Sequence, residues 1–200
     1  QALPIFGSIV KEQHCTLLST RPMMISKEKQ ASAFTTLKER FGYTNVFASP
    51  RLMKIVVSTG VGKADKNRKA LIEDRLSKIT GQKAAPRAAK QSIAQFKMRQ
   101  GDIVGYQVTL RGARMNDFLD KLVHIALPRT RDFRGLNATA IDDMGNLTIG
   151  IKDHTIFPET SDEDLKDVFG IAITLVTTAK NKEEAEAYFR HLGLPLKETA

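Results

Sequence analysis

The chain has 200 residues, of which 42% are hydrophobic, and this is enough for one sizeable core in a single domain. Its hydrophobic runs are far shorter than the roughly 20 residues that a membrane-spanning helix needs, so we expect no membrane segment. The formal net charge of +9 favours a polyanionic partner, and the single cysteine, Cys15, excludes an internal disulfide and fits the cytoplasm.

The positive charge is confined to the first two thirds of the chain. Residues 135–200 hold 6 Lys and Arg against 12 Asp and Glu, a net charge of −6. Residues 1–134 hold 25 against 10, a net charge of +15. This asymmetry predicts one face that meets phosphates and another that faces solvent or a basic protein.

The first 22 residues have neither a helical nor a strand period, and Pro22 ends them just before Met23 and Met24. We expect residues 1–22 to be an N-terminal tail that is disordered or not native, and residues 23–200 to form one domain. Two interpretations of the tail stay open: translation starts at one of these methionines, or the tail is a genuine extension.

Apolar spacing next predicts a helix, a strand and a second helix. The first helix begins at Ser26, a candidate N-cap, and ends at Gly42. Residues 52–59 are rich in β-branched side chains, as is typical of a strand, and they lead into Gly60-Val61-Gly62. A helix is predicted over 67–80. Its inner face would be formed by Leu71, Leu76 and Ile79.

The middle of the chain predicts another strand and a longer helix. Residues 104–111 alternate between apolar side chains and polar or small ones, which is the period of a half-buried strand. Residues 114–126 follow with an apolar stripe at helical spacing. We expect Pro128 to prevent the continuation of this helix, because proline has no N–H and clashes with the preceding turn.

Two strands and a last helix are predicted in the final third, over 147–152, 171–176 and from the candidate N-cap Asn181 to Gly193. The buried side of this helix would be formed by Ala185, Tyr188, Phe189 and Leu192. Helices and strands are mixed without regular βαβ alternation. We therefore expect an α+β fold: a single domain with a largely antiparallel sheet and helices packed on one face.

The turn Gly60-Val61-Gly62-Lys63 lies between a strand and a helix, where a phosphate-binding loop would be. The dinucleotide fingerprint needs a third glycine where Asp65 stands. The Walker pattern needs a glycine at the position of Val57 and a hydroxyl at that of Ala64. A tight turn of small residues, or one that approaches RNA phosphates near Lys63, fits the sequence better.

Residues 83–101 form a basic segment that holds no acidic residue. Its cations are Lys83, Arg87, Lys90, Lys97 and Arg99. The alanines between them are too small to cover a core, so we interpret the segment as an RNA-facing loop or ribbon. The alternative is a charged surface loop without a partner.

Residues 128–135 form a denser basic segment, with Arg129, Arg131 and Arg134 around one aromatic residue. Arginine offers a planar fork to phosphate and stacks on bases, so a segment of this kind suits RNA loops. A turn held by internal salt bridges is the alternative.

No arrangement of residues points to catalysis, a metal or a cofactor. The four histidines, His14, His124, His154 and His191, lie far apart and lack metal-ligand spacing. The acidic run from Asp162 to Asp164 is typical of a helix start. We therefore predict that the protein is not an enzyme and uses neither metal nor cofactor.

An ordered set of short segments extends from about Ser26 to Lys197. It comprises Pro50-Arg51-Leu52, Lys54-Ile55, Gly60-Val61-Gly62, Ile79-Thr80-Gly81-Gln82-Lys83, Ser92-Ile93-Ala94, Phe96-Lys97, Arg99-Gln100-Gly101, Val108 to Gly112, Arg114-Met115, Ala126-Leu127-Pro128-Arg129, Arg131 to Gly135, Gly145-Asn146, Ile156 to Glu159 and Thr177 to Lys180. Together they resemble the universal family of large-subunit ribosomal proteins number five, of bacterial type, whose members bind 5S rRNA.

The resemblance implies a structural protein of the central protuberance, in which the sheet side and its neighbouring loops hold 5S rRNA near 23S rRNA. The positions that match the family and become candidates for rRNA contact are Arg51, Lys54, Ser58, Thr59, Gly60, Gly62, Lys63, Arg129, Arg131 and Arg134. The chain departs from the family at Ser58-Thr59, where bacterial relatives often have Asn-Met.

The resemblance also implies contact with P-site tRNA through the basic segment 83–101. The candidates there are Lys83, Arg87, Lys90, Lys97 and Arg99. Ala88 and Gln91 stand where the family commonly has basic residues, while Arg87 supplies one additional basic residue. Family members further contact a small-subunit head protein and neighbouring large-subunit proteins, and the acidic last third is compatible with a basic partner of that kind.

The sequence therefore predicts a structural constituent of the large ribosomal subunit, located in the cytoplasm. Two other functions remain as alternatives. One is an enzyme that binds a nucleotide at the turn from Gly60 to Lys63, and the other is a free RNA chaperone outside the ribosome.

Overall fold

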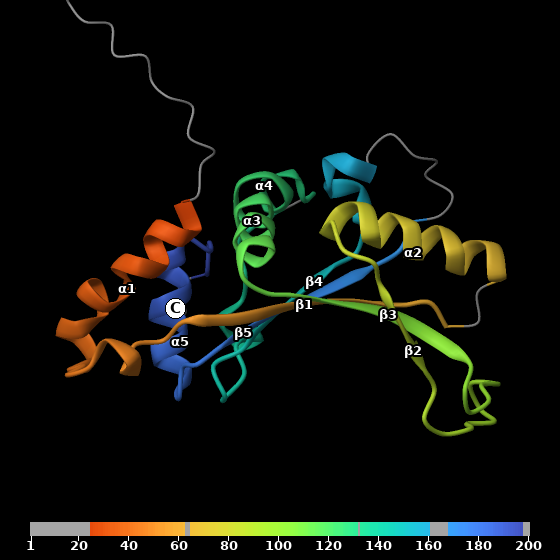
Figure 1. Cartoon of the computed structure of the whole chain (residues 1–200), viewed down its shortest axis with the longest axis horizontal. Coiled ribbons are helices and arrows are strands. Elements are labelled where there is room, and N and C mark those ends of the chain that lie inside the picture. Colours follow the sequence, from red (N-terminus) through yellow and green to blue (C-terminus); the bar gives the residue numbers. More distant parts are fainter. Residues whose placement is uncertain (1–24, 63–64, 132, 161–167, 198–200) are drawn as a thin grey trace, which may run out of the picture.

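Figure 1 shows a computed structural model of the chain, which describes residues 25–62, 65–131, 133–160 and 168–197. In chain order the main elements are α1 (Ile25–Phe41), β1 (Leu52–Gly60), α2 (Lys66–Thr80), β2 (Ala85–Ala88), β3 (Ile103–Leu110), α3 (Ala113–Lys121), a π-helical turn (Leu122–Ala126), α4 (Leu127–Arg129), β4 (Leu147–Ile151), β5 (Ile171–Thr177) and α5 (Lys182–Leu192). The expected tail over 1–22 and the acidic run from Asp162 to Asp164 lie outside the described residues.

The described strands form one antiparallel sheet in the order β2-β3-β1-β5-β4, with β1 at its centre. Ile55 of β1 lies opposite Leu110 of β3 and Leu175 of β5. Helices α2 and α3 lie on one side of the sheet, and α1 and α5 pack together at the end where β1 begins (Figure 1). The predicted α+β fold is confirmed.

Alternation along the strands gives the sheet one buried face and one open face. In β1 the side chains of Ile55 and Val57 are fully buried, whereas Val56 and Ser58 are half-buried. The same alternation runs through β4 and β5. Successive side chains of a strand point to opposite faces. One set therefore forms the core beneath the helices, and the other forms what we call the open face.

The start of β1 is fixed by a buried tyrosine from the last helix. The hydroxyl oxygen of Tyr188 accepts a hydrogen bond from the N–H of Leu52 at 3.0 Å. Burial raises the pKa of Tyr188 to about 12, although the Leu52 N–H opposes this rise. Helix α5 therefore holds the first residue of the central strand, and with it the placement of the open face.

The helix predicted over 114–126 continues past its expected end. The π-helical turn carries it from α3 into α4, which contains Pro128, and the N–H of Leu127 donates to the carbonyl oxygen of Leu122. A proline inside a helix removes one N–H donor and usually kinks the helix, and kinks also occur at π-helical turns. The helix here passes Pro128 and ends at Arg129, so the expectation that Pro128 prevents its continuation is wrong.

Two further expectations about the core need correction. The inner face of α2 is formed by Ile72, Leu76 and Ile79, whereas Leu71 is only half-buried, because Ile72 and not Leu71 lies one turn before Leu76. Ala84, expected to cover no core, is 2% exposed. Its N–H donates to Ser77 Oγ at 3.4 Å, which folds the chain back against α2.

We expect Gly145→Ala to destabilise the protein more than Gly42→Ala does. Both glycines have positive φ, +76° and +66°, so alanine is strained at either position by about 1–2 kcal/mol. Only at Gly145 would the new Cβ meet neighbours, with Ala179 Cβ at 2.8 Å. Thermal or urea unfolding of the two variants measures the difference. Equal losses would show that the packing at Gly145 adds nothing.

Candidate nucleic-acid interface

The open face carries mostly short side chains that end in hydroxyl, amide or methyl groups. Its members are Lys54, Val56, Ser58, Gln107, Thr109, Thr148, Ala172, Thr174 and Val176. The hydroxyl groups of Thr148 and Thr174 share a hydrogen bond of 3.2 Å across β4 and β5. Hydroxyl and amide side chains commonly bond to phosphate and sugar oxygens, so this surface suits a nucleic-acid backbone.

The two hydroxyl residues near the end of β1 face opposite ways. Ser58 belongs to the open face, whereas Thr59 is 6% exposed and donates its hydroxyl proton to the carbonyl oxygen of Gly170 at 2.7 Å. Both residues were predicted to contact rRNA. In this conformation only Ser58 offers its hydroxyl group to a ligand on the open face.

The turn after β1 uses its backbone amides internally. The N–H groups of Val61 and Gly62 both donate to the carbonyl oxygen of Val104, at 2.8 and 3.1 Å. A phosphate-binding loop needs such amides free to point at the phosphate. The exposed Gly60 and Gly62 therefore let another molecule come close to the backbone. The turn does not form a phosphate-binding loop for a nucleotide. Lys63 lies outside the described residues.

Arg51 and Lys54 lie at the opposite end of β1. Arg51 is exposed, and its backbone is bonded on both sides to Thr178: its N–H donates to Thr178 Oγ1 and its carbonyl accepts from the Thr178 N–H, each at 3.0 Å. Lys54 follows an irregularity in the pairing with β5, after Leu52. It is half-buried on the open face, so both cations border that face from the same end.

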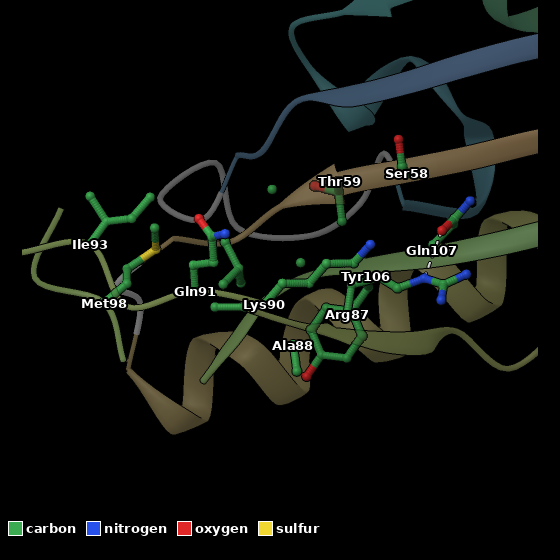
Figure 2. Close-up of a pocket in the computed structure, with 14 residues that line it drawn as sticks. Ser58, Thr59, Arg87, Ala88, Lys90, Gln91, Ile93, Met98, Tyr106 and Gln107 are labelled. Atoms are coloured by element: carbon green, nitrogen blue, oxygen red, sulfur yellow. Dashed lines mark hydrogen bonds between the residues drawn. The ribbon is translucent and has the colours of Figure 1, made fainter. Parts of the chain in front are cut away.

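The basic segment 83–101 forms edge strand β2 and then a ribbon, residues 89–102, as predicted. The two arms of the ribbon are joined by backbone bonds between Ile93 and Met98 and by the Ala89 N–H, which donates to the Asp102 carbonyl at 2.8 Å. Arg87 points over the open face and its Nε donates to Gln107 Oε1 at 2.7 Å (Figure 2). The ribbon thus has a fixed backbone.

The five predicted tRNA-binding cations are all exposed: Lys83, Arg87, Lys90, Lys97 and Arg99. Among the ion pairs found within the described ranges, none involves any of them. Lys97 is also the single non-glycine residue with positive φ in those ranges, at 51°. The charges of this segment are therefore available to an external anion.

Arg129 and Arg131 lie beside β4, at the sheet edge opposite to β2. With Lys152 and Thr155 they line a groove of about 1100 Å³. Arg134 is exposed too, close to the bridge between Leu136 and Leu196. Within the part of the chain that the structure describes, no ion pair holds these three arginines. Asp132, the acidic residue within this segment, lies outside the described residues, so the alternative of an internal salt-bridge turn stays open.

The predicted site residues thus fall into separate groups along one sheet. Arg51 and Lys54 lie at the start of β1, and Ser58 with Gly60 near its end. The ribbon extends from one edge of the sheet and the arginine segment from beyond the other. A ligand that touched all of these groups would have to be long and anionic, which fits folded RNA better than a small molecule.

Sequence reasoning did not find the buried polar pair beneath the sheet. Arg75 of α2 is 4% exposed and its Nη1 lies 3.3 Å from Nε2 of His154, which is itself 1% exposed and stacks on Phe169. Arginine is rarely buried unless paired, and the two residues are 79 positions apart, so spacing alone gives no signal of their contact. We interpret the pair as part of the core.

Within the described ranges, no group of three His, Cys, Asp or Glu side chains could hold a metal ion. A search of the same residues finds no helix long and apolar enough to cross a membrane.

Comparison with protein families gives two consecutive matches. Residues 45–99 match the model described as ribosomal protein L5, and residues 103–196 match the model for the C-terminus of the same ribosomal family. The two matched ranges include every strand of the sheet and almost the whole ribbon.

Several curated bacterial proteins are similar over most of their length, and each is named large ribosomal subunit protein uL5. The one from Flavobacterium johnsoniae is 46% identical over 175 residues, which is 86% of this chain and 96% of the relative. The one from Microcystis aeruginosa is 45% identical over 84% of this chain and 95% of its own length. The one from Heliobacterium modesticaldum is 47% identical, with shares of 86% and 97%.

We expect Ser58→Ala and Thr59→Val to have opposite effects. Ser58→Ala removes a hydroxyl group from the open face, so affinity for RNA should fall about 2- to 10-fold while the unfolding free energy stays the same. Thr59→Val removes the donor to the Gly170 carbonyl, so stability should fall by about 1–3 kcal/mol with RNA affinity kept.

Filter binding and urea unfolding of both variants make this comparison, each variant serving as control for the other. A loss of RNA affinity in folded Thr59→Val, without one in Ser58→Ala, would show that the two side chains have been assigned to the wrong faces.

Proposed function

The chain belongs to the ribosomal protein L5 family, and on that premise we propose that it binds 5S rRNA and neighbouring 23S rRNA in the central protuberance. It is a structural constituent of the large ribosomal subunit and not an enzyme, as predicted. Since the relatives are bacterial large-subunit proteins, the predicted location, the large subunit in the cytoplasm, is confirmed as well.

The observation that carries the rRNA proposal is the uncovered face of the sheet. Ser58 and Gln107 lie on that face, and Arg51 with Lys54 border it. The hydroxyl and amide groups would bond to phosphate and sugar oxygens, while the cations would neutralise phosphates. No helix among the described elements covers this face, so RNA would reach it without a rearrangement of the fold.

The arginine segment would extend the rRNA contact past the edge of the sheet. Arg129 and Arg131 line the groove beside β4, and Arg134 follows them on the surface. The groove is also lined by Lys152, a residue that was not among the rRNA-contact candidates derived from the sequence. Guanidinium groups of this kind can bind phosphate in a bidentate way, which supports a role in gripping an RNA strand.

The ribbon is proposed to contact P-site tRNA. Its fixed backbone and exposed cations would present charge to a phosphate strand at little cost in ordering the loop. Ala88 and Gln91 reduce the number of charges, and Arg87, which is held by Gln107, faces the sheet side of the ribbon. The tip of the ribbon, with Lys97 and Arg99, would therefore make most of the tRNA contact.

The acidic end of the protein is proposed to meet a basic protein of the small-subunit head. Asp142 and Asp143 lie in the exposed turn before β4, and Glu183 lies in the first turn of α5. Register puts this turn at the same end of the sheet as the start of β1, away from the ribbon. Contact with tRNA and with the other subunit would thus use opposite ends of the molecule.

The free-chaperone alternative is distinguished by the particle with which the protein travels. Family membership supports association with large subunits, and sedimentation of cell extract tests it directly. A protein that remains near the top of the gradient, apart from large subunits, would favour a role outside the ribosome.

The Arg129→Ala, Arg131→Ala, Arg134→Ala variant is predicted to bind 5S rRNA about ten-fold more weakly at about 0.1 M salt, with its fold intact. The logarithm of the binding constant falls with that of salt concentration by about 0.7–0.9 per neutralised phosphate, so the slope should also become shallower by up to about 2 to 3.

A charge-matched control is Lys180→Ala, Lys182→Ala, Arg190→Ala, which removes the same charge from the acidic third, away from the arginine segment, and should bind as the wild type does. Unchanged affinity and slope in the arginine variant would remove the segment from the 5S rRNA site.

Lys97→Ala, Arg99→Ala is expected to leave 5S rRNA binding unchanged but to weaken the retention of P-site tRNA by assembled ribosomes by a few-fold. Lys97 lies in the turn that joins the two arms of the ribbon and Arg99 follows the Ile93–Met98 bridge, and neither belongs to the open face. Dissociation rates of labelled tRNA from variant and wild-type ribosomes provide the measurement. Equal rates would argue that the tip makes no energetically important tRNA contact.

A further inference from the structure

A hollow of about 660 Å³ lies where the open face meets the ribbon (Figure 2). It is bounded by the last residues of β1, the first half of β3, and the chain from Arg87 to Met98. Its volume is within the range of small-molecule sites, about 300–1,000 Å³. No position in it has been assigned a ligand of its own beyond the general contact with RNA.

The floor of the hollow is bare backbone. Gly60 of β1 and Gly105 of β3 are paired residues in the sheet, and both line the hollow. A Cβ added to Gly105 would lie 2.6 Å from the carbonyl oxygen of Thr59, so only glycine fits there without a shift of β1. A Cβ at Gly60 would meet nothing within 4 Å. The space above Gly60 is therefore empty.

The walls differ in chemistry. Ile93, 40% exposed, and Met98 come from the ribbon and are apolar. On the other side Arg87 is held by Gln107, and Lys90 extends across the hollow with its ammonium group toward Ser58 and Gln107 (Figure 2). The described lining contains these two cations and no carboxylate. The site is thus flat and apolar in one part and cationic in another.

We propose that this hollow takes one unstacked nucleotide of the bound rRNA. Its base would lie on the glycine floor against Ile93 and Met98, and its phosphate would be bound by Arg87 and Lys90. A base has two flat apolar faces and sits beside an anion, which is the combination that these walls match. RNA-binding proteins commonly recognise loop bases that are splayed out of the helix.

A protein segment fits the hollow less well. Both strands that form its floor, β1 and β3, already have a partner on each side, so an incoming peptide would find no free strand edge to pair with. The source is assigned to rRNA and not to tRNA, because the floor, Gly60 and Gly105, belongs to the sheet whose open face is proposed to bind rRNA. The inference rests on the proposed function.

The test is to fill the hollow without changing any charge. Gly60→Leu puts a side chain into the empty space, and Gly60 has no positive φ that would strain it. Gly150→Leu is the control for filling another part of the proposed rRNA surface: Gly150 is exposed on the same face, in β4, where it lines the groove with Arg129 and Arg131, and its Cβ would also meet nothing within 4 Å. Each variant is bound to 5S rRNA, and the complex is probed with dimethyl sulfate and carbodiimide.

In the wild-type complex one unpaired nucleotide should have its base protected from these reagents. In the Gly60→Leu complex that base should become reactive while the rest of the footprint persists, and affinity should fall about ten-fold. The Gly150→Leu complex should keep the base protected. A second variant, Ile93→Ala with Met98→Ala, removes the apolar wall, which belongs to the ribbon and not to the sheet. It should expose the same base.

The proposal is overturned if the footprint of folded Gly60→Leu equals that of the wild type, or if every position weakens together and no single base stands out. If wild-type protein gives no footprint on 5S rRNA, the proposed function itself fails and this inference falls with it. The two failures are therefore distinguishable.

Discussion

The constraint on which this structure depends is that a single sheet is covered by helices on one face only. Because side chains of a strand alternate, each strand that supplies Ile55, Val57 or Ile173 to the core must present its other side chains on the uncovered side. Those side chains are short and polar or small, as Ser58 and Thr174 illustrate. The same alternation that builds the core thus builds a surface that a long polyanion can approach.

Rigid positioning of that surface follows from contacts on the covered side. Tyr188 holds the start of β1 through Leu52, and Thr59 ties its end to Gly170. Arg87 is oriented by Gln107 before any ligand arrives. Side chains placed in advance lose less entropy on binding. The basic groups outside the sheet, on the ribbon and beside β4, then extend the contact area at both edges.

The sequence predicted four of the five described strands, because a period of two is legible in residues such as Leu147, Ile149 and Ile151, but it did not predict β2, whose segment shows no such period. It also predicted the basic segments, since charge needs no tertiary information. It misjudged helix details that packing decides: the stripe of α2 includes Ile72, and a π-helical turn carries α3 past Pro128. The family resemblance implied that the sheet side meets rRNA, which residue patterns alone did not indicate.

What the sequence could not supply is the pairing of distant residues. The glycine floor of the hollow needs the register of Gly60 with Gly105, and the groove beside β4 needs Lys152 next to Arg129. The opposite orientations of Ser58 and Thr59 likewise depend on which face the helices cover. No local pattern records these relations, because they arise only when the sheet assembles.

A cryo-EM reconstruction of the large subunit that contains this chain would test the central claim most directly. Our account predicts RNA density against the open face, within hydrogen-bonding distance of Ser58 and Gln107, with α2 and α3 directed away from it. RNA packed against the helices, with the open face left to solvent or covered by another protein, would contradict the account.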